Sequence, residues 1–141
     1  MTFWDSSALV ALVSGEEDAD ELETVLASDD AIGLWWGSRV EWTSAICRVR
    51  RAGKIDELTA SRLLREMEEY VAGADEVEPL EDVRATACRL LRIHALRAAD
   101  ARQLAAALVW ADHRPSGIGF VCLDRRLRTA AEWEGFEVRS A

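Results

Sequence analysis

Lysine, histidine, cysteine and proline are all scarce in this sequence. Lys54 is the only lysine among 17 basic residues, and there are two histidines, three cysteines and two prolines. Because the cysteines are odd in number and form no C-x-x-C pair, a disulfide framework and a zinc knuckle are both disfavoured. We expect Cys47, Cys88 and Cys122 to be small, buried, apolar side chains.

Long hydrophobic runs are also missing. No apolar stretch approaches the roughly 20 residues that span a bilayer. The first residues lack the basic segment and the cleavage site of a secretory signal. These absences predict a cytoplasmic protein with no membrane association.

The chain is acidic and of moderate length. Half of its 141 residues are apolar and 30% are charged, which predicts one globular domain covering residues 1–141. A net charge of −9 and a pI near 4.7 argue against a surface that binds nucleic acid throughout. Local binding through metal ions and a few arginines stays possible.

Short apolar segments alternate with amphipathic ones along the whole chain. Strands are predicted at 2–5, 31–36, 117–124 and 136–138, with a weak strand or connector at 75–80. Helices are predicted at 6–14, 16–28, 39–53, 56–73, 125–135, and 81–113, the last as one helix or as two with a turn near 94–97. This alternation predicts an α/β fold, a three-layer α/β/α sandwich with a mainly parallel central sheet.

Four acidic residues occur in apolar context where strands end and helices begin. Asp5 and Asp124 each end a strand, Glu41 lies in the first turn after the second strand, and Asp100 interrupts an alanine-rich helix. The carboxyl ends of parallel strands meet at one edge of a sheet, and that edge is where such folds bind ligands. Four carboxylates gathered there would repel one another unless a cation held them.

Each of these acids also has a purely structural interpretation. Asp5 and Asp124 occupy positions where aspartate is a favoured helix N-cap. Ser38 and Glu41 match the capping box S-x-x-E, in which the glutamate bonds back to the backbone. Asp100 is an acid that a helix dipole favours in the first turn.

The segments around the four acids resemble the motifs of PIN-domain ribonucleases, particularly the VapC-like toxins of bacterial toxin–antitoxin pairs. The opening WDSSAL is similar to the first motif of that family and RVEWTSAICR to the second. LRAADARQLAAAL and FVCLDRRL resemble the third and fourth motifs, which are the specific ones. The resemblance covers essentially the whole chain, and it implies a PIN-like fold.

Three positions depart from the family pattern. Cys122 stands where a hydroxyl residue is common, Trp4 replaces a smaller aliphatic residue, and Ala95 replaces a glycine before the third motif. None of these changes removes a carboxylate.

The resemblance implies an Mg²⁺- or Mn²⁺-dependent endoribonuclease. Asp5 and Asp100 would bind the primary metal, and Asp124 and Glu41 would complete the catalytic cluster. Ser6, or alternatively Ser7, would orient Asp5 through a hydrogen bond. Candidate RNA contacts are Arg97, Arg102 and Arg125. The implied partners are an RNA substrate, a cognate antitoxin protein that covers the acidic site, and a second copy of the chain.

Other interpretations stay open at this stage. His94 and His113 could form a metal-independent acid–base pair. A phosphatase of the haloacid-dehalogenase type needs a second acid two residues after the first, where this chain has Ser7. A catalytically inert PIN-fold domain that binds RNA or protein is the main alternative. Among the tryptophans, core packing is favoured over base stacking for Trp35, Trp36 and Trp42.

Overall fold

The computed structural model describes residues 1–139, which form five strands and seven helices. The strands are β1 (Thr2–Trp4), β2 (Ile32–Trp35), β3 (Asp75–Val77), β4 (Gly119–Val121) and β5 (Glu137–Arg139). The helices are α1 (Ser6–Ser14), α2 (Ala19–Ser28), α3 (Ser38–Arg51), α4 (Glu57–Tyr70), α5 (Glu81–Ile93), α6 (Ala98–Trp110) and α7 (Arg125–Glu134).

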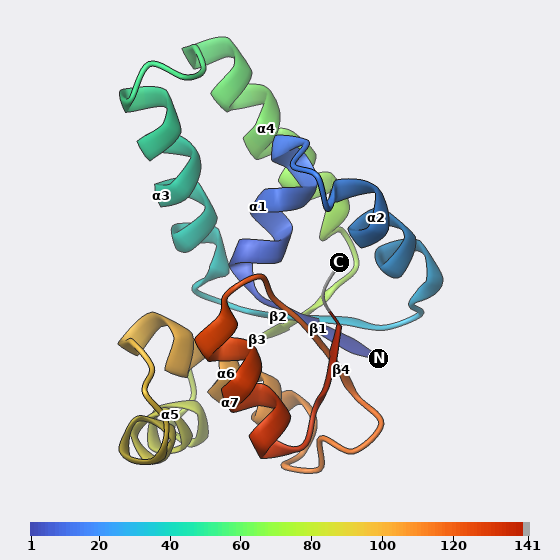
Figure 1. The fold of residues 1–141 in the computed structure, drawn as a ribbon, viewed down its shortest axis with the longest axis vertical. Helices are drawn as coiled ribbons and strands as arrows, with labels where there is room; N and C mark the ends of the chain where they lie inside the picture. The colour runs from blue at the N-terminus through green and yellow to red at the C-terminus, as the bar shows by residue number, and fades with distance from the viewer. Residues whose placement is uncertain (140–141) are drawn as a thin grey trace.

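All five strands form one parallel sheet in the order β3-β2-β1-β4-β5 (Figure 1). The first strand is central, and Phe3 pairs with Gly33 on β2 and with Phe120 on β4. Since β1 and β4 are neighbours, the residues that follow them emerge side by side at the same sheet edge. This topology confirms the predicted α/β fold, and the sheet is entirely parallel rather than mainly so.

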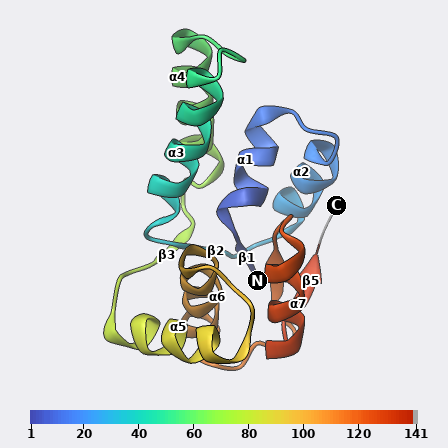
Figure 2. The same ribbon diagram turned by 60° about the vertical axis from the view of Figure 1, so that its left-hand side comes forward.

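The helices cover the two faces of the sheet as separate layers (Figures 1 and 2). Successive strand residues face opposite sides, so Phe3 packs in the core beneath α5, α6 and α7 while Trp4 packs in the core beneath α1 to α4. The Phe3 and Phe120 rings stack with centroids 5.8 Å apart. The result is the three-layer α/β/α sandwich that the alternating pattern predicts.

The predicted core residues are buried, with two corrections. Trp35 and Trp42 lie in the core, but Trp36 at the end of β2 is 52% exposed. Cys122 is buried, Cys47 is half-buried and Cys88 on α5 is exposed, so the expectation of three buried cysteines was wrong for Cys88 and only partly met by Cys47.

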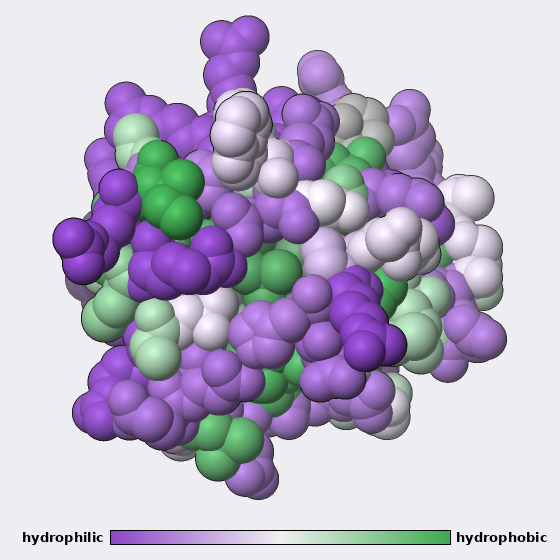
Figure 3. Space-filling model, turned by 90° about the horizontal axis from the view of Figure 1, so that it is seen from below, coloured by the Kyte–Doolittle hydropathy of each residue, from purple (hydrophilic) through white to green (hydrophobic). Residues whose placement is uncertain are grey.

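The segment 81–113 forms two helices, because the chain becomes extended at His94 and Arg97. No helix among the described residues has both the length and the apolar character to cross a membrane. The face formed by the α5–α7 layer is mainly hydrophilic, with separate hydrophobic side chains between the polar ones (Figure 3). Large exposed apolar side chains on this layer include Leu91, Ile93 and Trp133.

Candidate functional site

The four predicted acids all lie at the carboxyl edge of the sheet. Asp5 is the N-cap of α1 directly after β1, and Asp124 is the N-cap of α7 after β4. Glu41 lies in the first turn of α3, which follows β2, and Asp100 lies in the first turn of α6. The fold therefore brings together, at one edge, residues that are up to 119 positions apart.

Asp5 is the most deeply buried of these acids, with only 3% of its surface exposed. Its Oδ2 accepts hydrogen bonds from the backbone N–H of Ser7, at 3.0 Å, and from the Ser7 hydroxyl. Burial raises the pKa of Asp5 to about 7, and the nearby Glu41 and Asp100 charges add to this rise against the lowering effect of the Ser7 bonds. Ser7, rather than Ser6, is therefore the hydroxyl that orients Asp5.

Glu41 is held by side chains from two other helices. The Ser6 hydroxyl donates to its Oε1 at 3.1 Å, and Nε2 of Gln103 donates to its Oε2 at 3.1 Å. Burial raises the pKa of Glu41, the Ser6 and Gln103 bonds and the charge of Arg102 lower it, and the Asp100 charge raises it.

The capping box that the sequence suggested for α3 does not form. Gly37 is the N-cap, without a side-chain capping bond, and Ser38 is the first helical residue. The Ser38 hydroxyl instead accepts from Gln103, at 3.0 Å. The local motif fails because Glu41 is bound by Ser6 and Gln103, which the tertiary fold brings to it.

Asp100 and Asp124 line a cleft of about 500 Å³ between α6 and α7. Burial and the charge of Asp124 raise the pKa of Asp100, while the Arg97 backbone and charge lower it. Asp124 uses Oδ1 to accept from the backbone N–H of Leu127 at 2.9 Å. Arginine side chains supply positive charge around the same cleft, from Arg97, Arg125 and Arg126.

The four acids influence one another electrostatically, but their side chains are not drawn together. Among residues 1–139, no group of three or more histidine, cysteine, aspartate or glutamate side chains is close enough to hold a metal ion as it stands. The available donors are carboxylate and hydroxyl oxygens, the ligand type that Mg²⁺ and Mn²⁺ prefer.

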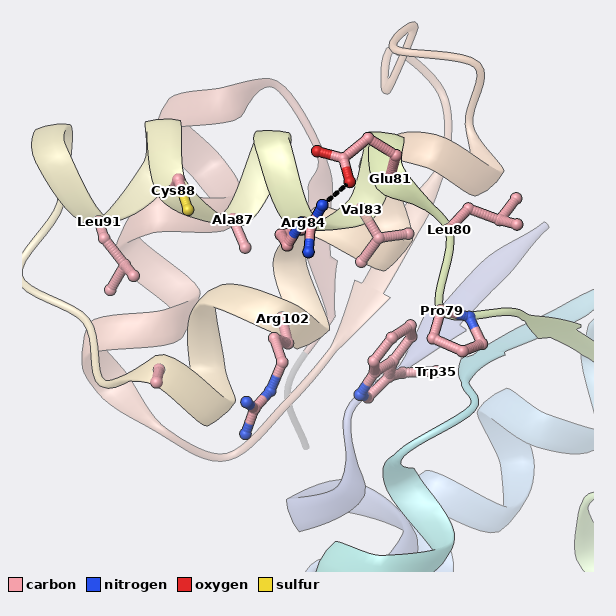
Figure 4. Close-up of a pocket in the computed structure, with 11 residues that line it drawn as sticks. Trp35, Pro79, Leu80, Glu81, Val83, Arg84, Ala87, Cys88, Leu91 and Arg102 are labelled. Atoms are coloured by element: carbon pink, nitrogen blue, oxygen red, sulfur yellow. Dashed lines mark hydrogen bonds and ion pairs between the residues drawn. The ribbon is translucent and has the colours of Figure 1, made fainter.

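A second, mostly apolar pocket of about 440 Å³ adjoins this edge (Figure 4). Trp35 and Pro79 form one side of it, and Val83, Ala87 and Leu91 of α5 form another. Arg102 of α6 also lines this pocket. The charge of Arg102 also lowers the pKa of Glu41, so one arginine both lines the pocket and acts on the carboxylate site. Of the predicted RNA contacts, Arg97 and Arg125 line the acidic cleft, whereas Arg102 lines the apolar pocket.

The two histidines are bound elsewhere. Nε2 of His94 is 2.8 Å from Glu134 on α7, and Nε2 of His113 is 3.0 Å from Asp82 on α5. Within the described chain neither contacts the other or any of the four acids. This geometry does not support the histidine acid–base pair.

Sequence reasoning missed Gln103. It is fully buried on α6, three residues after Asp100, and it joins Ser38 to Glu41. A signal was present, because Gln103 is an amide that directly precedes LAAAL, the buried apolar run of α6 at residues 104–108. Its partners are 62 and 65 positions away, so only the fold identifies them.

Comparison with known proteins gives two curated relatives and a structural neighbour. The chain is 33% identical over 150 residues to Ribonuclease VapC45 of Mycobacterium tuberculosis strain CDC 1551, covering 100% of this chain and 96% of that protein. The figures are the same for Ribonuclease VapC49 of Mycobacterium tuberculosis strain H37Rv. No family model matches.

One of the solved structures that resemble this chain is the crystal structure of PAE2754 from Pyrobaculum aerophilum. It superposes with a TM-score of 0.63 at 22% identity, covering 96% of this chain and 81% of that one. This similarity supports the fold alone.

Proposed function

We infer the function from the family: the chain belongs to the VapC ribonucleases, which are PIN-domain proteins. We propose that it is a metal-dependent endoribonuclease and the toxin of a toxin–antitoxin pair. The observation that carries this proposal is the placement of Asp5, a buried carboxylate, at the same edge of the sheet as Glu41, Asp100 and Asp124. Burying an ionisable group among like charges is costly, and a bound cation would remove that cost.

The oxygen donors fit Mg²⁺ or Mn²⁺. Asp5 and Asp100 would hold the primary ion, and Asp124 and Glu41 would complete the site. The chemistry that such an ion would supply is polarisation of the scissile phosphate and a lower pKa for a nearby water. Ser7 fixes the orientation of the Asp5 carboxylate through two hydrogen bonds to one oxygen.

The RNA backbone would cross the cleft between α6 and α7. Arg97, Arg125 and Arg126 line this cleft, where their guanidinium groups could bind phosphate oxygens through charged hydrogen bonds. Asp124 or Glu41 would accept the proton from the attacking water. Trp36, exposed at the end of β2, offers a ring on which an unpaired base could stack.

Two protein partners belong to the same proposal. An antitoxin with a basic segment would cover the acidic site, since the net charge of −9 favours a positively charged partner. The apolar pocket between Trp35 and α5 gives such a partner a hydrophobic surface next to the carboxylates. A second copy of the chain would form a homodimer, which sedimentation of the purified protein would detect.

The deciding experiment is RNA cleavage by purified, antitoxin-free protein. Structured RNAs are incubated with Mg²⁺, Mn²⁺ or EDTA, using wild type, Asp5→Asn and Asp100→Asn. Asp20→Asn, an exposed acid on α2, is the matched control because it removes one charge away from the sheet edge. We expect cleavage that requires metal, disappears in both site variants and persists in the control.

Two results would contradict the proposal. Cleavage that survives EDTA and both substitutions would rule out carboxylate–metal catalysis. An absence of cleavage together with no Mn²⁺ binding by calorimetry would favour an inert RNA- or protein-binding domain.

A further inference from the structure

Gln103 is a fully buried amide whose hydrogen bonds run toward the carboxylate site. Its Nε2 donates to Oε2 of Glu41 at 3.1 Å and to the Ser38 hydroxyl at 3.0 Å. A carboxylate can only accept hydrogen bonds, so the amide nitrogen must be the atom that faces Glu41. The orientation of the Gln103 side chain is thereby fixed.

The other end of the Gln103 amide has no partner. Its Oε1 is buried and, among the described residues, accepts no hydrogen bond. Buried polar atoms are normally paired, and an unpaired one destabilises the fold. A methionine of similar length would fill the same space and remove the unpaired oxygen, although the Ser38 hydroxyl and Glu41 would lose the amide as a donor. Packing alone therefore does not explain a glutamine here, but its contact with Glu41 does.

The contact also links Glu41 to the other acids. Each oxygen of Glu41 receives one neutral donor, Ser6 from the helix that begins after Asp5 and Gln103 from the helix that carries Asp100. Two donors from different helices hold the carboxylate in one rotamer. The position of the Glu41 carboxylate therefore depends on α1, which begins after Asp5, and on α6, which carries Asp100.

We propose that Gln103 is a positioning residue that holds the Glu41 carboxylate in register with Asp5 and Asp100 for cation binding. This inference rests on the proposed function. The inference goes beyond the proposed function by assigning a role to a residue that carries no charge and does not itself reach the substrate. It also predicts a variant that stays folded but binds metal less well.

The test compares Gln103→Met with wild type by calorimetric titration with Mn²⁺. Leu104→Met, at the next buried position of α6, is the matched control for repacking. Loss of a group that orients a metal ligand typically weakens metal affinity by about 10-fold or more. We expect that loss in Gln103→Met, with kcat reduced, KM for RNA little changed and a cooperative thermal transition that shows a folded protein. The control should bind Mn²⁺ like wild type.

A second background shows whether the effect passes through Glu41. In Glu41→Ala, adding Gln103→Met should cause no further loss of Mn²⁺ affinity, because the carboxylate that the amide holds is absent. If Gln103→Met fails to fold, Gln103→Asn, whose shorter side chain no longer reaches Glu41, replaces it in both backgrounds.

Three outcomes overturn the inference. Unchanged Mn²⁺ affinity in Gln103→Met, while wild type binds, refutes it and leaves the proposed function standing. An equal loss in the Glu41→Ala background shows a general structural effect instead. Failure of wild type itself to bind Mn²⁺ removes the proposed function, and this inference falls with it.

Discussion

Replacing Asp5 with asparagine is expected to stabilise the metal-free protein while abolishing its activity. Burial, aided by Glu41 and Asp100, raises the pKa of Asp5 from an ordinary 3.8 to about 7. The folded state therefore binds a proton more tightly than the unfolded state does. Between these two pKa values, stability falls as the pH rises, and above about 7 the full penalty is present. Asparagine removes the charge but keeps an oxygen that can accept the two Ser7 hydrogen bonds.

The magnitude follows from the two pKa values. The difference between 3.8 and about 7 corresponds to about 4 kcal/mol at a pH above both. Side-chain relaxation will reduce this, so a gain of about 2–4 kcal/mol at roughly pH 8 is expected, or about 10 °C in melting temperature. Near pH 5 the advantage of the Asp5→Asn variant should be smaller by about 2 kcal/mol, because the folded wild type is then protonated at Asp5.

The assay is urea unfolding of wild type and Asp5→Asn in EDTA across that pH range. Asp20→Asn again serves as the control for removing one negative charge, and it should show no comparable gain at the higher pH. An Asp5→Asn variant that is equally or less stable than wild type at about pH 8 would refute the reasoning, because the carboxylate would then be well accommodated without a cation.

Three further predictions concern particular side chains. Ser7→Ala should weaken Mn²⁺ binding by about 10-fold or more, measured by calorimetry, because Asp5 loses the hydroxyl that orients it; unchanged affinity would argue against that role. His94→Ala and His113→Ala should each keep cleavage rates within about twofold of wild type, and a loss of about 100-fold in either would revive acid–base catalysis by histidine. Gly33→Ala should lower the melting temperature by more than an ordinary surface change, because its Cβ would lie 2.6 Å from a neighbouring indole ring; a normal melting curve would contradict the close packing.

The sequence was most informative where local chemistry and tertiary position agree. The apolar strands around 2–4 and 119–121 were predictable because both faces of a central parallel strand are buried, which gives a continuous apolar run. The edge strands were harder to predict. Two of the three residues of Asp75–Val77 are exposed, so the segment has little apolar pattern. The break at 94–97 lacks both glycine and proline, and the sequence therefore left one helix or two open.

The site shows the same division between local and long-range information. The four acids could be found because strand ends and helix starts are visible in the sequence. The roles of Ser6 and Ser7 could not, because adjacent helical residues project about 100° apart and only the packing decides which acid each one meets. Here the Ser7 hydroxyl donates to Asp5, the N-cap of α1, and the Ser6 hydroxyl donates to Glu41 on α3. Gln103 was missed for a related reason, since its partners come from distant segments.

The structural and functional interpretations of the two capping aspartates are compatible. Asp5 accepts both of its hydrogen bonds at Oδ2, and Asp124 accepts its capping bond at Oδ1. In each case, within the described residues, the second oxygen makes no hydrogen bond to another side chain or to the backbone. An ionised carboxylate has about four acceptor positions, so one oxygen can fix the start of the helix while the other remains available to a cation. Capping thus gives each carboxylate a fixed direction at the sheet edge, which is what a metal ligand delivered by a strand end requires.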